Sequence, residues 1–375
     1  MRASLRSRGS HRNDSRGFPS SPGSERPDHQ PPLVSHMRPI TPLVAILTAA
    51  ALGCSNDSKL QDTTSHGTAG ANSDTAAITA ARTDTAAGGG AGAARAGGAT
   101  KVKTIDGFKT PESVKWDASS GYWYVSNING QPPAKDNNGF ISRLTKDGAV
   151  DSLHFITSGK NGVTLNAPKG IAIIGDTLFV ADIDVIRAFN KTTGAPIHSW
   201  DVSKQGAKFL NDVATTPDGG VYITDTQVAF NANGSVTHTG TDRIFMISKD
   251  RKSASIAIQS DSLGRPNGIT WDAKGNRFIV VAFGANAVHA WTPGSKTVST
   301  IATGPGQFDG VEITSDGRLL VSSWTDSSVS VVNGNTMTHL VTGVEAPADI
   351  GLDPARGLLA VPLFNKGQVE LWQVK

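Results

Sequence analysis

One short phrase recurs six times between Thr104 and Lys375, and this repeat constrains the fold more than any other feature of the sequence. Each copy places polar, small or acidic residues ahead of a β-branched Val or Ile, which opens a short apolar run. The copies are Pro111-Glu112-Ser113-Val114, Pro168-Lys169-Gly170-Ile171, Leu210-Asn211-Asp212-Val213, Pro266-Asn267-Gly268-Ile269, Phe308-Asp309-Gly310-Val311 and Pro347-Ala348-Asp349-Ile350. Successive Val or Ile anchors are 57, 42, 56, 42 and 39 residues apart. Spacings of this size are typical of four-stranded propeller blades, so the repeat predicts six of them.

The composition after Lys101 is that of an all-β domain. Val, Ile, Thr and aromatic residues form short runs bounded by Asp-Gly, Asn-Gly and Pro, and no amphipathic helix stands out. A segment of about 275 residues suits one propeller rather than two domains. We therefore predict an all-β, six-bladed β-propeller over residues 101–375.

The last repeat runs out of chain before a fourth strand. Its three expected strands are 350–352, 358–361 and 369–374, whereas an unassigned strand, 102–105, precedes the first inner strand. Pairing the two would remove both exposed sheet edges. We therefore expect an N-terminal strand to close the ring.

The first 100 residues have a different character. Residues 1–36 hold six Arg against three acidic residues, which accounts for the whole net charge of +3. The rest of the chain is neutral and predicts no nucleic-acid partner. We expect 1–36 to be a disordered or untranslated leader, and the Ala/Gly/Ser/Thr-rich segment 55–100 to be a disordered linker, since it has too little apolar surface to fold.

Residues 37–54 have the order of a lipoprotein-type signal peptide. Met37-Arg38 supplies a positive start, 43–52 is a short apolar run, and Ala51-Leu52-Gly53-Cys54 resembles the bacterial lipobox. This predicts an exported bacterial lipoprotein, anchored to the membrane through a lipidated Cys54 on the periplasmic or extracellular side. The mature domain would contain no thiol, and we expect it to be monomeric.

The residue two positions before each anchor should face the propeller axis. These residues, called the ring below, are Glu112, Lys169, Asn211, Asn267, Asp309 and Ala348. Unpaired carboxylates are strongly disfavoured in such a crowded channel, so Glu112 and Asp309 need either Lys169 or a bound cation. The amide oxygens of Asn211 and Asn267 favour the cation.

Two carboxylates and two carboxamides are hard oxygen ligands, which suit Ca²⁺ best. Mn²⁺, Mg²⁺ and Zn²⁺ are alternatives, although the ring offers Zn²⁺ none of its preferred His or Cys donors. Any one of these four residues could simply shape a turn before a strand. Their shared repeat position favours a metal site.

Four of the repeats carry a resemblance to a known family. The segments are Pro111-Glu112-Ser113-Val114-Lys115-Trp116-Asp117, Leu210-Asn211-Asp212-Val213, Pro266-Asn267-Gly268-Ile269-Thr270-Trp271 and Phe308-Asp309-Gly310-Val311. They resemble signature segments of the senescence marker protein, regucalcin and gluconolactonase family of six-bladed propellers. The resemblance implies that Glu112, Asn267 and Asp309 are direct metal ligands, and that Asn211 is a fourth ligand or a substrate contact.

The same resemblance implies a metal-dependent hydrolase of a lactone or ester. A metal at the channel mouth would polarise the carbonyl and acidify a water molecule, and Asp309 would be the general base. Lys169 would either help to stabilise the oxyanion or act as a fixed counter-charge.

Two departures leave an alternative open. Sugar-lactone hydrolases of this family often have Arg where this chain has Phe209, which favours a more apolar lactone or ester here. The segment Ala167-Pro168-Lys169-Gly170-Ile171 reads more like an NHL-type repeat. The alternative is an NHL-like, non-catalytic binding propeller with a structural metal or polar ring.

Two insertions interrupt the repeat, at 127–139 and 227–241, and the sequence does not say on which face they lie. The second insertion contains His238. The five histidines of the predicted domain have no partner in the sequence pattern, so we expect surface or core roles for them: His154, His198, His238, His289 and His339.

Overall fold

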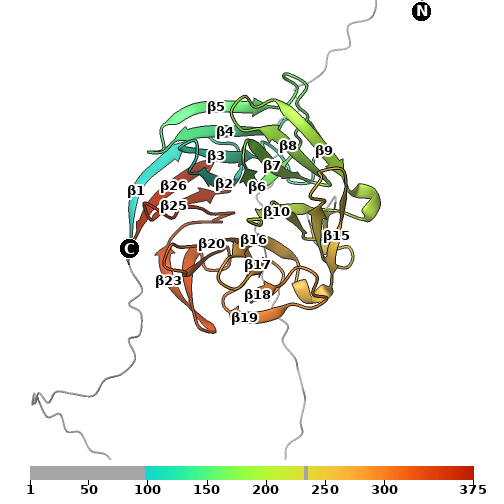
Figure 1. Cartoon of the computed structure of the whole chain (residues 1–375). Helices are drawn as coiled ribbons and strands as arrows, with labels where there is room; N and C mark the ends of the chain where they lie inside the picture. The colour runs from blue at the N-terminus through green and yellow to red at the C-terminus, as the bar shows by residue number, and fades with distance from the viewer. Residues whose placement is uncertain (1–97, 232–234) are drawn as a thin grey trace, which may run out of the picture. The chain divides into compact units, whose positions relative to one another are not determined.

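The computed structural model describes residues 98–231 and 235–375. It contains six four-stranded antiparallel sheets arranged around a central axis, which confirms the predicted all-β, six-bladed propeller (Figure 1). The predicted leader, signal peptide, Cys54 and almost all of the linker lie outside the described residues, so export and lipidation stay predictions. In the part of the chain that is described, no helix has the length and hydropathy of a transmembrane segment.

Each blade runs from an inner strand at the axis to an outer strand at the rim. Blade 1 contains β2 (Pro111–Asp117), β3 (Tyr122–Asn127), β4 (Phe140–Thr145) and β5 (Val150–Thr157). Blade 2 contains β6 (Pro168–Ile174), β7 (Thr177–Asp182), β8 (Val185–Asn190) and β9 (Pro196–Asp201). Blade 3 contains β10 (Leu210–Thr215), β11 (Val221–Asp225), β14 (Arg243–Ile247) and β15 (Ala254–Gln259).

The second half of the domain repeats this order. Blade 4 contains β16 (Pro266–Asp272), β17 (Arg277–Ala282), β18 (Ala287–Trp291) and β19 (Ser299–Thr303). Blade 5 contains β20 (Phe308–Ile313), β21 (Leu319–Ser323), β22 (Ser328–Asn333) and β23 (Thr336–Thr342). Blade 6 contains β24 (Gly351–Asp353), β25 (Leu358–Leu363), β26 (Gln368–Val374) and β1 (Ala99–Asp106).

In the described part of the chain, a short hairpin and two 3₁₀ turns lie outside the blades. A hairpin of β12 (Val228–Phe230) and β13 (Val236–His238) lies within the second insertion. Two 3₁₀ turns, η1 (Ser203–Gln205) and η2 (Asp261–Leu263), precede the inner strands of blades 3 and 4. Both turns end at a glycine with positive φ, at Gly206 and Gly264, where a Cβ would be disfavoured.

The N-terminal strand closes the propeller as predicted. β1 pairs antiparallel with β26, from Ala99 opposite Val374 to Asp106 opposite Gln368, and the two strands lie side by side in Figure 1. The strand begins at Ala99, slightly before the expected boundary at Lys101. It completes the sheet of blade 6 and leaves β26 paired on both sides.

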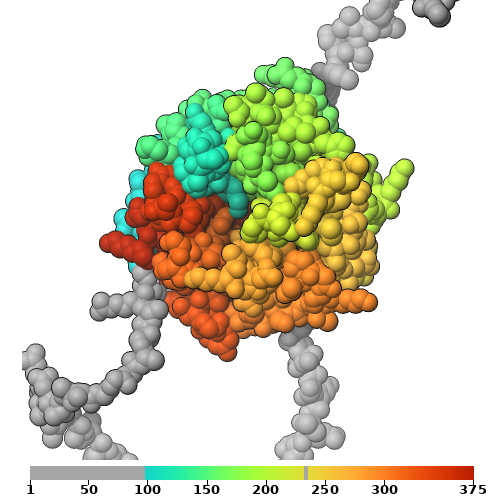
Figure 2. Space-filling model, in the orientation of Figure 1, coloured from blue at the N-terminus to red at the C-terminus, as the bar shows by residue number. Residues whose placement is uncertain are grey.

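Apolar cores lie between neighbouring blades, and each contains one of the six repeat anchors. The anchors Val114, Ile171, Val213, Ile269, Val311 and Ile350 belong to six different buried clusters. Each cluster draws on two neighbouring blades, and the blades are packed against one another in the space-filling view (Figure 2). The Val or Ile of the repeat therefore packs between blades, while the residue two positions earlier is left for the axis.

Neighbouring inner strands approach so closely that a side chain would not fit between them. A Cβ added at Gly310 would lie 2.4 Å from the Ile350 nitrogen and 2.7 Å from the Asp349 Cα. A Cβ added at Gly268 would lie 2.4 Å from the Asp309 carbonyl oxygen. Glycine directly after the ring residue therefore allows the strands to converge.

We expect Gly310→Ala to lower the free energy of unfolding by about 1–3 kcal/mol, because the methyl group meets backbone on the next blade. Urea unfolding of both proteins measures the difference. Gly130→Ala is the matched control, since its Cβ would meet only the ends of the Asp136 and Asn138 side chains, at 3.2 and 3.4 Å. A loss for Gly310→Ala below about 0.5 kcal/mol, the usual range for a surface change, would show that the inner strands can separate.

Candidate metal centre at the propeller axis

A β-bulge positions the ring residue in five of the six blades. The register between the inner strand and its neighbour shifts across the ring residue in every one of these pairs: Pro111/Val114, Pro168/Ile171, Leu210/Val213, Pro266/Ile269 and Phe308/Val311. A bulge leaves a residue outside the ladder and re-aims its side chain. The bulge thus frees the ring residue from strand pairing.

Hydroxyl groups on the second strands take the place of the missing ladder bonds. Ser126, Thr224 and Ser322 accept hydrogen bonds from the backbone N–H groups of Ser113, Asp212 and Gly310, respectively, at 2.8–2.9 Å. Thr224 also donates to the Asn267 carbonyl at 2.6 Å, and Ser322 donates to the Ala348 carbonyl at 2.9 Å. These two side chains therefore fasten a bulge to the ring position of the next blade.

The four predicted metal ligands all present a buried oxygen without a hydrogen-bond partner. These atoms are Glu112 Oε2, Asn211 Oδ1, Asn267 Oδ1 and Asp309 Oδ1. The four side chains are at most 5% exposed. The Asn211 amide nitrogen donates to Thr226 Oγ1 at 3.0 Å, which orients its carbonyl oxygen away from that bond. Buried acceptors are normally satisfied, so four unpaired oxygens at one repeat position form a site whose chemistry suits a cation.

Lys169 is buried in the ring but does not neutralise it by direct pairing. Its Nζ donates to the Ala167 carbonyl at 3.1 Å and lies 4.2 Å from the centroid of the Phe209 ring. None of the ion pairs within residues 98–231 and 235–375 includes Lys169, so the structural ion pair considered from the sequence does not form. Its charge nevertheless acts on Glu112 and lowers the pKa of that carboxyl, against the larger effects of burial and of Asp309.

The ring disfavours its own charges when nothing else is bound. Burial, followed by the charges on Asp309 and Asp349, raises the pKa of Glu112 well above its ordinary value. Burial and the charge on Asp349 raise the pKa of Asp309, and the Trp324 indole and the Asn267 amide oppose this rise. Burial likewise lowers the pKa of Lys169. A cation among these oxygens would favour the ionised carboxylates.

A second layer of carboxylates lies next to the ring, and the sequence reasoning did not assign it a role. Asp349 accepts a hydrogen bond from Ser113 Oγ at 2.5 Å, while Asp212 accepts from the Val213 and Ile269 N–H groups at 2.6 and 2.7 Å. Both side chains are therefore satisfied by protein donors, unlike the ring.

No group of three or more His, Cys, Asp or Glu residues in the described part of the chain has metal-binding geometry. The ring does not meet that description because it contains only two carboxylates. Its other two oxygens belong to amides, which are ordinary ligands for hard cations such as Ca²⁺.

Both insertions lie on the face where the ring opens. The second insertion follows β11, whose last residue, Asp225, pairs with Leu210, the residue before Asn211. The first follows β3, whose last residue, Asn127, pairs with Pro111, the residue before Glu112. Strand pairing thus answers the question that the sequence left open.

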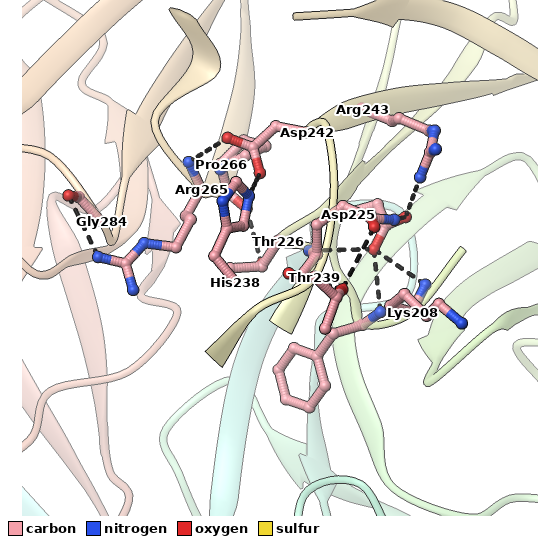
Figure 3. A network of polar contacts seen from close by, with 12 residues as sticks. Lys208, Asp225, Thr226, His238, Thr239, Asp242, Arg243, Arg265, Pro266 and Gly284 are labelled. Atoms are coloured by element: carbon pink, nitrogen blue, oxygen red, sulfur yellow. Dashed lines mark hydrogen bonds and ion pairs between the residues drawn. The ribbon is translucent and has the colours of Figure 1, made fainter. Parts of the chain in front are cut away.

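The second insertion is held in place by a polar network over blades 3 and 4 (Figure 3). Asp242 accepts from the Arg265 backbone N–H at 2.6 Å and bonds to His238 Nε2 at 2.8 Å. Asp225 accepts from the Phe209 backbone N–H at 2.9 Å. Phe230 of the insertion packs against Phe209 in a tilted arrangement with ring centroids 5.3 Å apart, so the insertion also reaches the neighbourhood of Lys169.

The expectation that the histidines lack partners is wrong for three of the five. His238 pairs with Asp242, and His339 pairs with Asp326 at the same distance of 2.8 Å. His289 Nδ1 lies 3.2 Å from Thr300 Oγ1. Strand pairing or a turn brings each histidine to its partner, and the sequence pattern does not specify these contacts.

Comparisons with known proteins agree with this architecture. A gluconolactonase from Xanthomonas campestris superposes with a TM-score of 0.53 and 15% identity, over 72% of this chain and 88% of its own. A luciferin-regenerating enzyme gives 0.55 and 13%, over 74% and 94%. Streptogramin B lyase gives 0.51 and 11%, over 73% and 97%. At these identities the likeness shows the fold alone.

The sequence comparisons are more specific. No curated protein matches this chain at significant sequence similarity. The family model described as SMP-30/Gluconolactonase/LRE-like region matches residues 110–352, a span that covers more than half of the chain and includes the whole ring. The chain therefore belongs to the SMP-30/gluconolactonase/LRE-like family of propellers.

Proposed function

We propose that this protein is a metal-dependent hydrolase that opens a lactone or cleaves an ester at the mouth of the central channel. The observation that carries the proposal is the set of four buried, unpaired oxygens from four different blades. Membership of a family that includes gluconolactonases supports the same reaction class.

The donor set fits a hard divalent cation, with Ca²⁺ as the first candidate. Glu112, Asn211, Asn267 and Asp309 would hold it, and water or substrate would complete the 6–8 oxygen ligands that Ca²⁺ takes. A cation bound there would supply positive charge for a carbonyl oxygen and would acidify water in the site. Mn²⁺ and Mg²⁺ accept the same ligands, whereas Zn²⁺ would lack nitrogen and sulfur donors.

Side chains of the ring would then carry out the proton transfers of the reaction. The carboxylate of Asp309 would accept a proton from the water molecule whose oxygen bonds to the carbonyl carbon. As the bond from that carbon to the ring or ester oxygen breaks, the same proton would pass to the departing alkoxide. Lys169, whose ammonium group is buried in the ring, would donate to the developing oxyanion.

Cation removal tests this proposal. We expect chelation, followed by removal of the chelator, to abolish turnover of a panel of lactones and esters, and added Ca²⁺ to restore it best among Ca²⁺, Mn²⁺, Mg²⁺ and Zn²⁺. Restoration should be accompanied by a higher melting temperature, since a ligand at 100 times its Kd stabilises the folded state by about 2.7 kcal/mol. A cation-dependent melting temperature without turnover in any state would instead support the non-catalytic binding propeller.

A further inference from the structure

A second set of residues, also one per blade, surrounds the mouth of the channel. Each member directly follows the second strand of its blade, at the end where the ring lies. The set, called the collar below, consists of Ile128, Ile183, Thr226, Phe283, Trp324 and Phe364. Five of the six are apolar and none is charged.

The backbone ties the collar to the ring in five blades. The collar residue donates its N–H to the carbonyl of the residue two positions before the ring residue, at distances from 2.9 to 3.2 Å. The pairs are Ile128 to Thr110, Thr226 to Phe209, Phe283 to Arg265, Trp324 to Gln307 and Phe364 to Ala346. This repeated bond places the collar at a constant height above the candidate metal centre.

The apolar members form one continuous arc. Phe364 packs against Ile128 and Ile183 in a small apolar cluster. It also contacts Trp324, with ring centroids 5.2 Å apart, and Trp324 contacts Phe283 at 5.6 Å in an edge-to-face arrangement. Only Thr226 interrupts the arc, on the side of the channel that carries the second insertion.

The aromatic half of the arc is available to a ligand. Phe283, Trp324 and Phe364 are each only partly buried, although they are large apolar side chains at the end of a strand. Trp324 follows Ser323, which pairs with Phe308, so the indole stands beside the strand residue that precedes Asp309.

A surface hollow reaches one end of this aromatic wall, at Phe364. This hollow, of 470 Å³, lies between blades 6 and 1. Its lining includes Phe364 and Phe108 together with polar and charged residues such as Lys109 and Lys366.

We infer that the collar is a subsite for an aromatic substituent, so that the preferred substrates are aryl-bearing lactones or esters rather than polyhydroxylated ones. The inference rests on the proposed hydrolase function and specifies its substrate class. Three partly exposed aromatic rings at the mouth can stack on an aryl group in offset or edge-to-face geometry. A substrate covered with hydroxyl groups would instead bury donors and acceptors against apolar side chains, which is unfavourable.

A matched pair of lactones tests the subsite. γ-Phenyl-γ-butyrolactone and γ-methyl-γ-butyrolactone share the reacting ring and release similar alkoxides, so the ratio of their kcat/KM values reports the substituent. In Ca²⁺-loaded protein we expect the phenyl compound to be preferred, and Phe364→Ala and Trp324→Ala to reduce the ratio by about 10-fold or more. Trp372→Ala removes a partly buried aromatic residue of β26, far along the strand from the mouth, and should leave the ratio unchanged.

Binding provides a readout that does not need turnover. The corresponding lactams, 5-phenyl- and 5-methyl-2-pyrrolidinone, resist hydrolysis, and calorimetry gives their affinities for the parent and for each variant. If lactones are not hydrolysed but the phenyl lactam binds preferentially and loses that preference in Phe364→Ala, the subsite stands and the hydrolase falls. If lactones are hydrolysed and the phenyl-to-methyl ratio is the same in every variant, the subsite is overturned and the hydrolase stands. Absence of both turnover and phenyl-selective binding overturns both.

Discussion

Replacing Asp309 by Asn is expected to lower kcat/KM for lactone or ester hydrolysis by about 10²- to 10⁴-fold, the usual contribution of a general base. Asn keeps the size of the side chain and an oxygen for the cation, but it cannot accept a proton. Asp309 is the ring carboxylate whose free Oδ1 is buried beside Asn267 and the Trp324 indole. Steady-state kinetics with saturating Ca²⁺ would measure the loss.

The control for this variant is Asp316→Asn, in the exposed turn at the other end of the same blade. Asp316 pairs with Arg318 at the surface. Its replacement should leave kcat/KM within about a factor of two of the value for the parent protein. Metal content must be measured for both variants, because a ligand change can also empty the site. Full activity in Asp309→Asn at normal metal content would remove Asp309 from the chemistry.

Deleting residues 99–106 is expected to abolish cooperative folding of the propeller. The deletion removes the whole of β1, exposes the pairing edge of β26 and uncovers part of the core between blades 6 and 1, to which Ile105, Val369 and Leu371 belong. Unpaired edges also promote association between molecules. Circular dichroism during heating, together with size-exclusion chromatography, would detect both effects.

A point substitution in β1 tests the same contacts if the deleted protein cannot be expressed. Ile105 is 5% exposed, and Ile105→Ala should lower the free energy of unfolding by about 2–5 kcal/mol. Val102→Ala, at a site that is 59% exposed on the same strand, should change it by less than about 0.5 kcal/mol. If the deleted protein melts like a chain that begins at residue 98, the closure contributes nothing to stability.

Much of the scaffold could be predicted because the same residue types recur at the same position of each blade. The Val or Ile of each repeat must pack between two blades, so apolar β-branched residues recur at one position, and the axial position follows by counting back two. The same counting identified Glu112, Asn211, Asn267 and Asp309, which the structure buries with unpaired oxygens. The strand 102–105 was also assigned correctly to blade 6, since a closed ring needs a partner for β26.

Other features could not be read from the sequence because they depend on pairing register. The inner strands begin at Pro168 and Pro266, earlier than the apolar runs suggest, because a bulge carries the strand across the ring residue. The collar escaped notice because Ile128, Thr226 and Trp324 share a place in the fold but no residue type. The partner of His339 became evident only once β22 and β23 were placed side by side.

The ring and the collar are held in place in different ways. Substitutions in the collar should therefore have different consequences from substitutions in the ring. The ring is fixed by side-chain hydroxyls, among them that of the collar residue Thr226. The collar residues of blades 1, 4, 5 and 6 are attached by main-chain bonds that any residue other than proline can make. Single substitutions in the collar should accordingly change selectivity for the substituent of the substrate and leave the ring unchanged. A library that randomises the three partly exposed positions, Phe283, Trp324 and Phe364, should therefore yield many folded proteins with altered preferences.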